Sequence, residues 1–305
     1  MEGKTTEATL AILILLVTSI ATPQSLQQKH GVNHRPLKPA AMIWSGKSAG
    51  MLVRWSKSDI IVQEGNDSRP VLSPLVKRGF AAFSAATLDG VDKNDPTANC
   101  DYERTFALLS VVGSIMSFDD GYYADCNGAH PSTYSRITAV DLAKPASILY
   151  TDDPGNDVQA TDLKHPNKIV KLTDYFPEAG VLKALIDNKT IQPLLKERPN
   201  SIASLISMVQ QSGMEIKDCP YDLPQDFLTR FAFDHLVESN VVVKVSLPAS
   251  GQACDAAELE LLLEVPESLR RPLDLASKGQ EGFLVKNHAP GETKFSRKLG
   301  KGANR

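Results

Sequence analysis

The side chains best suited to chemistry lie between Ser117 and Leu142, in a stretch that reads SFDDGYYADCNGAHPSTYSRITAVDL. It contains two adjacent carboxylates, Asp119 and Asp120, and a histidine, His130. A carboxylate within hydrogen-bond reach of an imidazole can act as an acid–base pair, which would suit a hydrolase. His130 could also bind a ligand or donate a hydrogen bond within its own turn. No cysteine or second histidine accompanies His130 at catalytic spacing, so we predict no catalytic residue.

The residues around His130 have the composition of a turn that leads into a strand. Glycine at position 128 permits backbone conformations closed to other residues, and proline at 131 fixes the entry of the strand. We therefore predict a structural turn made of Asn127, Gly128, Ala129 and Pro131. Adjacent carboxylates on a loop usually point to solvent, where they could meet a ligand. The predicted binding residues are His130, Asp119, Asp120, Tyr122 and Tyr123.

Two other patterns match chemical motifs only in part. Residues 46–50 fit G-x-S-x-G, a motif in which the serine must stand on a sharp turn between a strand and a helix. The residues that follow alternate as a strand does, so Ser48 lacks the helix that would present it. Acidic loops at 92–95 and 152–157 lack the D-x-[DN]-x-[DN]-G order of a calcium loop. We predict no metal site and no cofactor.

The chain contains four cysteines, which allow three pairings. The first two are equally far in sequence from Gly113, so a hairpin that turns there would bring them opposite each other. The last two bracket a second predicted hairpin, which turns at Glu238 and Ser239. They lie four residues away from directly opposite positions, so a loop beside one of them must make up the difference. Four free buried thiols are the alternative. The predicted disulfides are Cys100–Cys126 and Cys219–Cys254.

The N-terminus indicates export from the cytoplasm. An apolar stretch from Ala8 to Ala21 is about 14 residues long, short of the roughly 20 that cross a bilayer as a helix. Small residues, Ser19 and Ala21, stand at the −3 and −1 positions of a cleavage site after Ala21. We predict a signal peptide over residues 1–21 and a periplasmic or secreted protein without a stable membrane span after cleavage. A buried or anchoring N-terminal helix is the alternative.

Composition excludes several classes of protein. Hydrophobic residues make up 42% and charged residues 23% of the 305 residues, which is ordinary for a globular chain and not for a disordered one. The net charge is −3, so no basic excess indicates nucleic acid as a partner. Aromatic residues are only 6%, which argues against a carbohydrate groove lined with stacked rings.

The periodicity predicts an α+β fold, with antiparallel sheet and two or more helices packed on one face. Strands are expected at 51–62, at 102–118 with a break at Gly113, and at 133–142, 168–172, 241–247 and 259–263. Helices are expected at 71–86, at 177–195, and over an apolar stripe from Ile202 to Val209, with Asn200 or Ser201 as the cap and Gly213 as the stop. Grouped strands, then helices, then further strands favour this class over a repeating βαβ order.

The expected organisation has five parts, of which the smaller β-rich segment comes before the main domain. Residues 1–21 are the signal peptide and 22–45 a linker. Residues 46–100 form a small N-terminal α+β segment, 101–272 the main domain, and 273–305 a polar, basic tail. The last 12 residues, from Lys294, are expected to be solvated and frayed, with a contact to anionic envelope polymers as the alternative.

The order of motifs after residue 100 resembles the RsiV-like C-terminal domain family, named after an anti-sigma factor and also found in extracytoplasmic proteins without an assigned activity. The resemblance rests on the turn at 127–131, the strand that ends in Asp141-Leu142, and the segment Leu172-Thr173-Asp174-Tyr175-Phe176 before a helix. It covers roughly residues 100–270. The chain departs from the family's pattern at Asn127, where the family tends to have glycine, and at Tyr175, where it tends to have leucine.

The resemblance implies an extracytoplasmic domain that recognises a partner, because in the anti-sigma factor the related domain binds lysozyme. Lysozyme or a peptidoglycan-related glycan is therefore the expected partner. We see no second membrane segment in the sequence and do not extend anti-sigma signalling to this chain. The expected function is a non-catalytic binding protein of the cell envelope. An envelope hydrolase that uses His130, and a purely structural envelope protein, are the alternatives.

Overall fold

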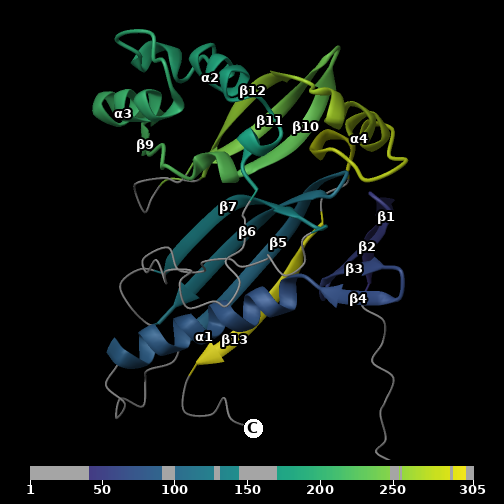
Figure 1. Ribbon diagram of the computed structural model, residues 1–305. Helices are drawn as coiled ribbons and strands as arrows, with labels where there is room; N and C mark the ends of the chain where they lie inside the picture. The colour runs from purple at the N-terminus through teal and green to yellow at the C-terminus, as the bar shows by residue number, and fades with distance from the viewer. Residues whose placement is uncertain are drawn as a thin grey trace, which may run out of the picture. The chain divides into compact units, whose positions relative to one another are not determined.

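The computed structural model describes residues 41–90, 100–126, 131–143, 170–247, 254, 256–288 and 291–299 (Figure 1). The predicted signal peptide, the turn residues Asn127, Gly128 and Ala129, and His130 lie outside these ranges. The two acidic loops at 92–95 and 152–157 lie outside them as well.

The N-terminal part of the described chain is a four-stranded antiparallel sheet in the order β1-β2-β3-β4. Ala49 and Gly50 join the first two strands with positive φ angles of 48° and 80°, the backbone of a tight two-residue hairpin. The G-x-S-x-G motif is therefore a hairpin, and Ser48 donates a 2.7 Å hydrogen bond to the carbonyl of Gly113. The predicted linker overlaps the first strand by several residues. The strands are β1 (Met42–Ser48), β2 (Met51–Ser56), β3 (Ile60–Glu64) and β4 (Asp67–Pro70).

The long helix α1 (Leu72–Gly90) follows this sheet and confirms the helix expected from residue 71. Asp59 organises its first turn, because the carboxylate accepts hydrogen bonds from the amides of Leu72 at 2.8 Å and Ser73 at 3.2 Å. A carboxylate at this end also meets the positive pole of the helix dipole.

The central sheet has the order β13-β5-β6-β7 and is antiparallel throughout. Gly113, at a φ of 58°, turns the β5–β6 hairpin as predicted. Residues 293–299 are not frayed as expected: they pair with β5, which makes them the edge of this sheet (Figure 1). The strands are β5 (Cys100–Val112), β6 (Ile115–Asp125), β7 (Ser132–Asp141) and β13 (Thr293–Leu299).

A third sheet, in the order β10-β11-β12, contains the second predicted hairpin. Glu238 occupies its turn with a positive φ of 54°. Alternate residues of β12 are buried leucines, and the glutamates between them are exposed, as expected for a strand that is wet on one face. The strands are β10 (Phe231–Val237), β11 (Asn240–Leu247) and β12 (Ala257–Glu264), and a small separate hairpin is formed by β8 (Met214–Ile216) and β9 (Cys219–Tyr221).

The shorter helices follow local signals in the sequence. Ser201 caps α3 by accepting a 3.1 Å hydrogen bond from the amide of Ser204, and Gly213 ends that helix, as predicted. The helix expected at 177–195 is shorter and stops at Ile186. The strand expected at 168–172 is wrong for its described part: Leu172 begins a 3₁₀ turn, because Asp174 accepts a 3.0 Å hydrogen bond from the amide of Lys171. The α-helices are α2 (Glu178–Ile186), α3 (Ile202–Ser212) and α4 (Glu267–Ser277), and the 3₁₀ turns are η3 (Leu172–Asp174), η4 (Gln192–Leu194), η5 (Phe227–Thr229) and η6 (Val285–Asn287).

A separate apolar core covers each face of the central sheet. Phe106, Phe118 and their neighbours pack with the N-terminal sheet and with the start of α1. Ile115 and Ala139, on the other face, pack with the β10–β12 sheet and with α2 and α3. The predicted antiparallel sheet and β-rich N-terminal segment are confirmed. The helices do not share one face of a single sheet, because the described strands divide into several sheets.

Within the described ranges, no helix combines the length and the apolar character that crossing a membrane requires.

Both predicted disulfides are present, Cys100–Cys126 and Cys219–Cys254. They span 26 and 35 residues, for which the loss of chain entropy in the unfolded state corresponds to about 3–4 kcal/mol each. We expect the double variant Cys100→Ala/Cys126→Ala to lower the free energy of unfolding by about that amount in a denaturant titration. The matched variant Cys219→Ala/Cys254→Ala should lose a similar amount. A loss below about 1 kcal/mol in both would contradict the pairing.

His288 should make the stability of the protein depend on pH. Its ring lies 4.0 Å from that of Phe283 and 5.7 Å from that of Trp55, and its Nε2 atom is buried without a partner among the described residues. Burial lowers the pKa of His288 below its usual 6.5, so the unfolded chain binds this proton more readily than the folded one. Stability should therefore fall as the pH drops below about 6.5, and His288→Phe should flatten that fall. The free energy of unfolding of the wild type and of His288→Phe can be measured by urea titration at several pH values from 8 to 5. If it fell equally with pH in both proteins, His288 would not have this role.

Candidate functional site

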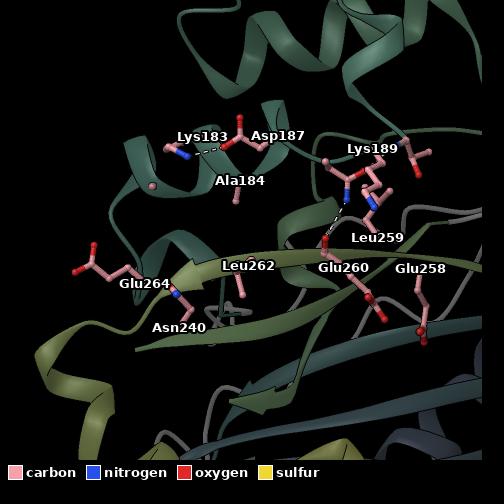
Figure 2. Close-up of a pocket in the computed structure, with 13 residues that line it drawn as sticks. Lys183, Ala184, Asp187, Lys189, Asn240, Glu258, Leu259, Glu260, Leu262 and Glu264 are labelled. Carbon is pink, nitrogen blue, oxygen red and sulfur yellow. Dashed lines mark hydrogen bonds and ion pairs between the residues drawn. The ribbon is translucent and has the colours of Figure 1, made fainter. Parts of the chain in front are cut away.

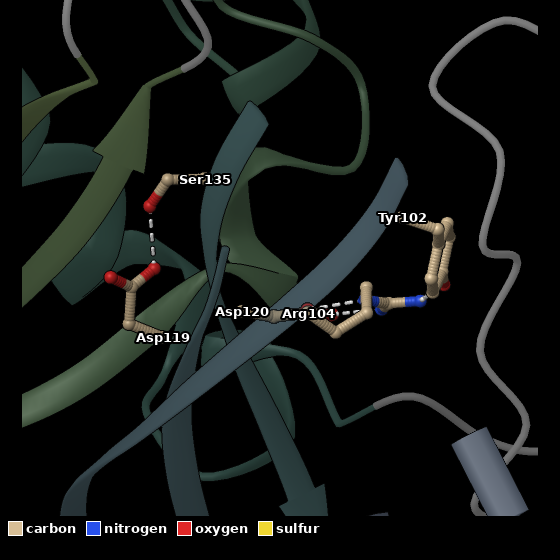
Figure 3. Close-up of polar contacts among 5 residues, drawn as sticks. All are labelled: Tyr102, Arg104, Asp119, Asp120 and Ser135. Carbon is tan, nitrogen blue, oxygen red and sulfur yellow. Dashed lines mark hydrogen bonds and ion pairs between the residues drawn. The ribbon is translucent and has the colours of Figure 1, made fainter. Parts of the chain in front are cut away.

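The two adjacent carboxylates of the sequence lie on a strand and point to opposite faces of the central sheet. Asp119 and Asp120 are both in β6, where successive side chains alternate between the faces. Figure 3 shows Asp119 with Ser135 on one side of the strand and Asp120 with Arg104 on the other. The expectation of a solvent-facing pair on a loop is therefore wrong, and the two acids cannot act together at one site.

Asp120 is fully buried in an ion pair with Arg104 of β5. Arg104 Nε donates to Asp120 Oδ1 at 2.9 Å and Nη2 donates to Oδ2 at 2.5 Å, so the pair is bidentate. Arg104 Nη1 also donates to the hydroxyl of Tyr102 at 3.2 Å, and the guanidinium lies 5.4 Å from the ring centre of Phe106. This geometry satisfies both charges internally, which assigns Asp120 to the architecture of the sheet.

Tyr122 belongs to the same face as Asp120 and packs in an aromatic group. Its ring centre lies 5.5 Å from that of Tyr102 and 6.4 Å from that of Phe83 on α1. Tyr123 lies on the other face, and its hydroxyl approaches Asp125 only at 3.5 Å. The predicted binding residues of β6 are thus split between two faces, and His130 lies outside the described residues.

Asp119 has the surroundings of a binding residue. The hydroxyl of Ser135 on β7 donates to Asp119 Oδ1 at 2.7 Å, and no cation pairs with this carboxylate among the residues that the structure describes. Burial raises the pKa of Asp119 above its usual value, and the negative charges of Asp120 and Glu258 raise it further against the opposing hydrogen bond from Ser135. A half-buried carboxylate without a counter-ion is costly to keep ionised, and a cationic or hydrogen-bonding ligand would compensate it.

Asp119 and Ser135 line a cavity of about 720 Å³, which we call the inter-sheet pocket. The central sheet contributes one wall, and the β8–β9 hairpin and the ends of β11 and β12 contribute the rest. The disulfide at Cys219 borders the cavity and ties that hairpin to the chain at Cys254. A pocket of this size suits a small ligand or one side chain of a larger partner. Its lining residues are Leu109, Asp119, Ser135, Ile137, Ile216, Lys217, Cys219, Tyr221, Ser246, Ala256, Ala257 and Glu258.

The charges of the inter-sheet pocket are unequally compensated. Glu258 forms a 2.9 Å ion pair with Lys244, while Asp119 has no counter-ion among the described residues and is held by hydrogen bonds from the Ser135 hydroxyl and the Asp120 backbone. Lys217, in the turn between β8 and β9, is exposed at the rim. The sequence analysis missed Ser135, Ser246 and Glu258, because only the pairing of the strands and the packing of the sheets bring them near Asp119.

A second cavity, of about 780 Å³, lies between α2 and the edge strand β12 (Figure 2). Lys183 and Asp187 on the helix form a 2.5 Å ion pair, and Asn188 donates a 2.9 Å hydrogen bond to the carbonyl of Glu260. Leu262 is 54% exposed among the outward-facing glutamates of the strand. The remaining charged side chains of this groove, among them Lys189, Glu260 and Glu264, are exposed to solvent, which compensates them without a ligand, whereas Asp119 in the inter-sheet pocket is half-buried.

His235, which stands alone in the sequence, has partners for both ring nitrogens. Its Nδ1 atom lies 2.9 Å from Asp234 Oδ2, and its Nε2 atom lies 3.0 Å from Lys286 Nζ. Lys286 belongs to η6 and lies 51 positions after His235, so the sequence alone does not indicate this contact. In the part of the chain that the structure describes, no three histidine, cysteine, aspartate or glutamate side chains are arranged to hold a metal ion.

No protein-family model matches the chain, and neither the curated proteins nor the solved structures yield a match. The resemblance to the RsiV-like family therefore stays a prediction, and the inter-sheet pocket is the feature of the molecule that bears on function.

The Arg104–Asp120 pair should behave as a structural unit. We expect Arg104→Met to lower the free energy of unfolding by about 3–5 kcal/mol, because it leaves Asp120 buried without its counter-charge. The double variant Arg104→Met/Asp120→Leu should recover much of that loss, and Lys183→Met, which breaks an exposed pair, should cost about 0–1 kcal/mol. Chemical denaturation of all three variants measures these differences. Equal losses in the single and double variants would show that the charges do not depend on each other.

Proposed function

We propose that the protein is a non-catalytic binding protein of the cell envelope, periplasmic or secreted, whose ligand occupies the inter-sheet pocket. The observation that carries this proposal is the half-buried carboxylate of Asp119, which faces a cavity and is ion-paired with no cation among the described residues. A charged group kept in this state is unusual in a part of a protein that serves packing alone.

Two features support a place outside the cytoplasm. The four cysteines form two disulfides, which persist in oxidising compartments and are rare in the cytosol. The N-terminal sequence has the apolar stretch and small-residue pair of a signal peptide. The two features are independent, since one concerns the folded domain and the other the segment before it.

The ligand classes to test first come from the predicted family resemblance, which implies lysozyme or a peptidoglycan-related glycan. The pocket is acidic where Asp119 and Glu258 line it, and this favours groups that carry positive charge or donate hydrogen bonds. A purely structural envelope protein would need no such pocket.

An envelope hydrolase is the second candidate, and one observation favours it. The raised pKa of Asp119 is the property that a general acid needs. The other carboxylate of the pocket, Glu258, is ion-paired with Lys244, and Asp120 is bound to Arg104 on the opposite face of the sheet. Because neither is free to act beside Asp119, we prefer binding without turnover.

Filling the rim of the inter-sheet pocket should abolish binding. Ala256 is exposed and lines the pocket, so Ala256→Trp should obstruct it while the core stays unchanged. Ala179→Trp, on the exposed side of α2, is the matched control. We expect the full-length exported protein to bind a lysozyme or peptidoglycan fragments, and Ala256→Trp to bind at least tenfold more weakly in calorimetry at two salt concentrations.

Equal affinity in the wild type and in Ala256→Trp would show that the ligand does not use this pocket. Release of soluble fragments from peptidoglycan by the wild-type protein, and its loss in Asp119→Asn, would replace the binding function by the hydrolase. If neither lysozyme nor peptidoglycan bound to the wild-type protein, the proposed ligand classes would be wrong.

A further inference from the structure

We infer that the inter-sheet pocket takes a ligand with a primary ammonium group and a hydrogen-bonding group beside it, with Asp119 holding the ammonium and Ser246 the neighbouring group. This inference rests on the proposed function and specifies the chemistry of the same site.

The hydroxyl of Ser246 is the independent observation. The residue is only 2% exposed, it lines the pocket, and none of the described residues bonds its side chain, although its backbone amide donates to the carbonyl of Arg230 at 2.8 Å. The Oγ atom of Ser246 is not one of the fully enclosed unpartnered atoms of the described residues, so this hydroxyl opens toward the pocket and can bond a group there. A ligand in the pocket would supply the partner that the described chain does not.

Ser246 and Asp119 reach the same cavity from different sheets. Ser246 stands directly opposite Glu258 in the β11–β12 register, and both line the pocket. Asp119, Ser246 and Glu258 all line this one cavity, so a single ligand in it can meet the three groups. The ion pair between Glu258 and Lys244 leaves Asp119 as the anion in need of compensation.

An ammonium group fits Asp119 better than a neutral group or an anion does. The carboxylate accepts one hydrogen bond from Ser135 and has further lone pairs for the N–H donors of a ligand. Charge-assisted hydrogen bonds of this kind are among the stronger ones, and the partly buried setting reduces their screening by water. An anionic ligand would meet both Asp119 and Glu258, with only the exposed rim residue Lys217 of opposite sign among the lining residues.

A free amino sugar and a lysine side chain of a partner protein both supply this chemistry. Two matched pairs of probes separate the sources and test the charge. The first pair is glucosamine and N-acetylglucosamine, which differ at the nitrogen. The second pair is the amide of Nα-acetyl-lysine and its Nε-acetylated form.

The experiment is calorimetric titration of the full-length protein with each probe at pH 7. At least one of the two amines should bind tenfold or more tightly than its acetylated partner. Asp119→Asn should remove that preference, and Ser246→Ala should weaken binding of the same amine severalfold. Lys217→Ala removes a positive charge at the rim, which has the same sign as the ligand's ammonium group. It should leave the affinity for the amine unchanged or increase it. Preference for one amine only would support the inference and identify the source.

Several results would overturn the inference. Acetylated probes that bind as tightly as the amines, amines that do not bind at all, or an amine preference that survives in Asp119→Asn would each do so. Unchanged melting temperatures of Asp119→Asn and Ser246→Ala show that lost affinity is not lost folding, and Asp119→Glu, which keeps the charge, should restore part of it. The test with Ala256→Trp remains separate. If the wild type bound lysozyme or peptidoglycan, Ala256→Trp did not, and the wild type showed no preference for the amines, the proposed function would stand. The inference of an ammonium ligand would then be wrong.

Discussion

A slip of one residue in the β5–β6 hairpin would exchange the two faces of β6, the strand that holds both aspartates. The turn at Gly113 sets the register as far as Ser110, a one-residue irregularity between Leu108 and Ser110 shifts it, and the Cys100–Cys126 disulfide closes the hairpin at the other end. Between these points the pairing places Phe106 opposite Asp120 and Ala107 opposite Asp119. The site depends on this register, because it decides which carboxylate is buried with Arg104 and which one faces the inter-sheet pocket.

Two chemically identical neighbours consequently have opposite roles. Asp120 has a bidentate guanidinium partner and lies in a face that packs with the N-terminal sheet and α1. Asp119 has one hydrogen bond from a serine and lies in the face toward the β10–β12 sheet. A buried carboxylate is tolerated when it is paired with a cation and hydrogen-bonded. Burial without a cation raises its pKa, and a cationic ligand would stabilise the ionised form. The contrast with Asp120 is what makes Asp119 a candidate for binding.

Local signals in the sequence predicted those parts of the fold that local physics determines. The Gly113 hairpin, the Ser201 cap, the alternating β12 and both disulfides followed from spacing and residue type. The assignment of Asp119 and Asp120 to a solvent-facing loop failed, because their strand carries polar residues where a half-buried strand would alternate. The C-terminal strand β13 was missed because its many basic residues are typical of a solvated tail, yet Lys294 and Lys298 pair with acids of β5.

The candidate site itself was beyond the reach of sequence reasoning. Ser246 and Glu258 follow Asp119 by 127 and 139 positions in the sequence, and nothing in their neighbourhoods marks them as polar groups of one cavity. Only the packing of two sheets brings them together, with the β8–β9 hairpin held at the rim by the Cys219–Cys254 disulfide.

The most direct test of this account is a carbon-detected NMR titration of the Asp119 carboxyl group, with and without glucosamine. Because burial and nearby negative charge act on this group, the free protein should show a pKa above the ordinary aspartate value of about 3.9. Bound ammonium stabilises the ionised form, so the pKa should fall when the ligand is present. An ordinary pKa in the free protein that glucosamine does not change would contradict the account.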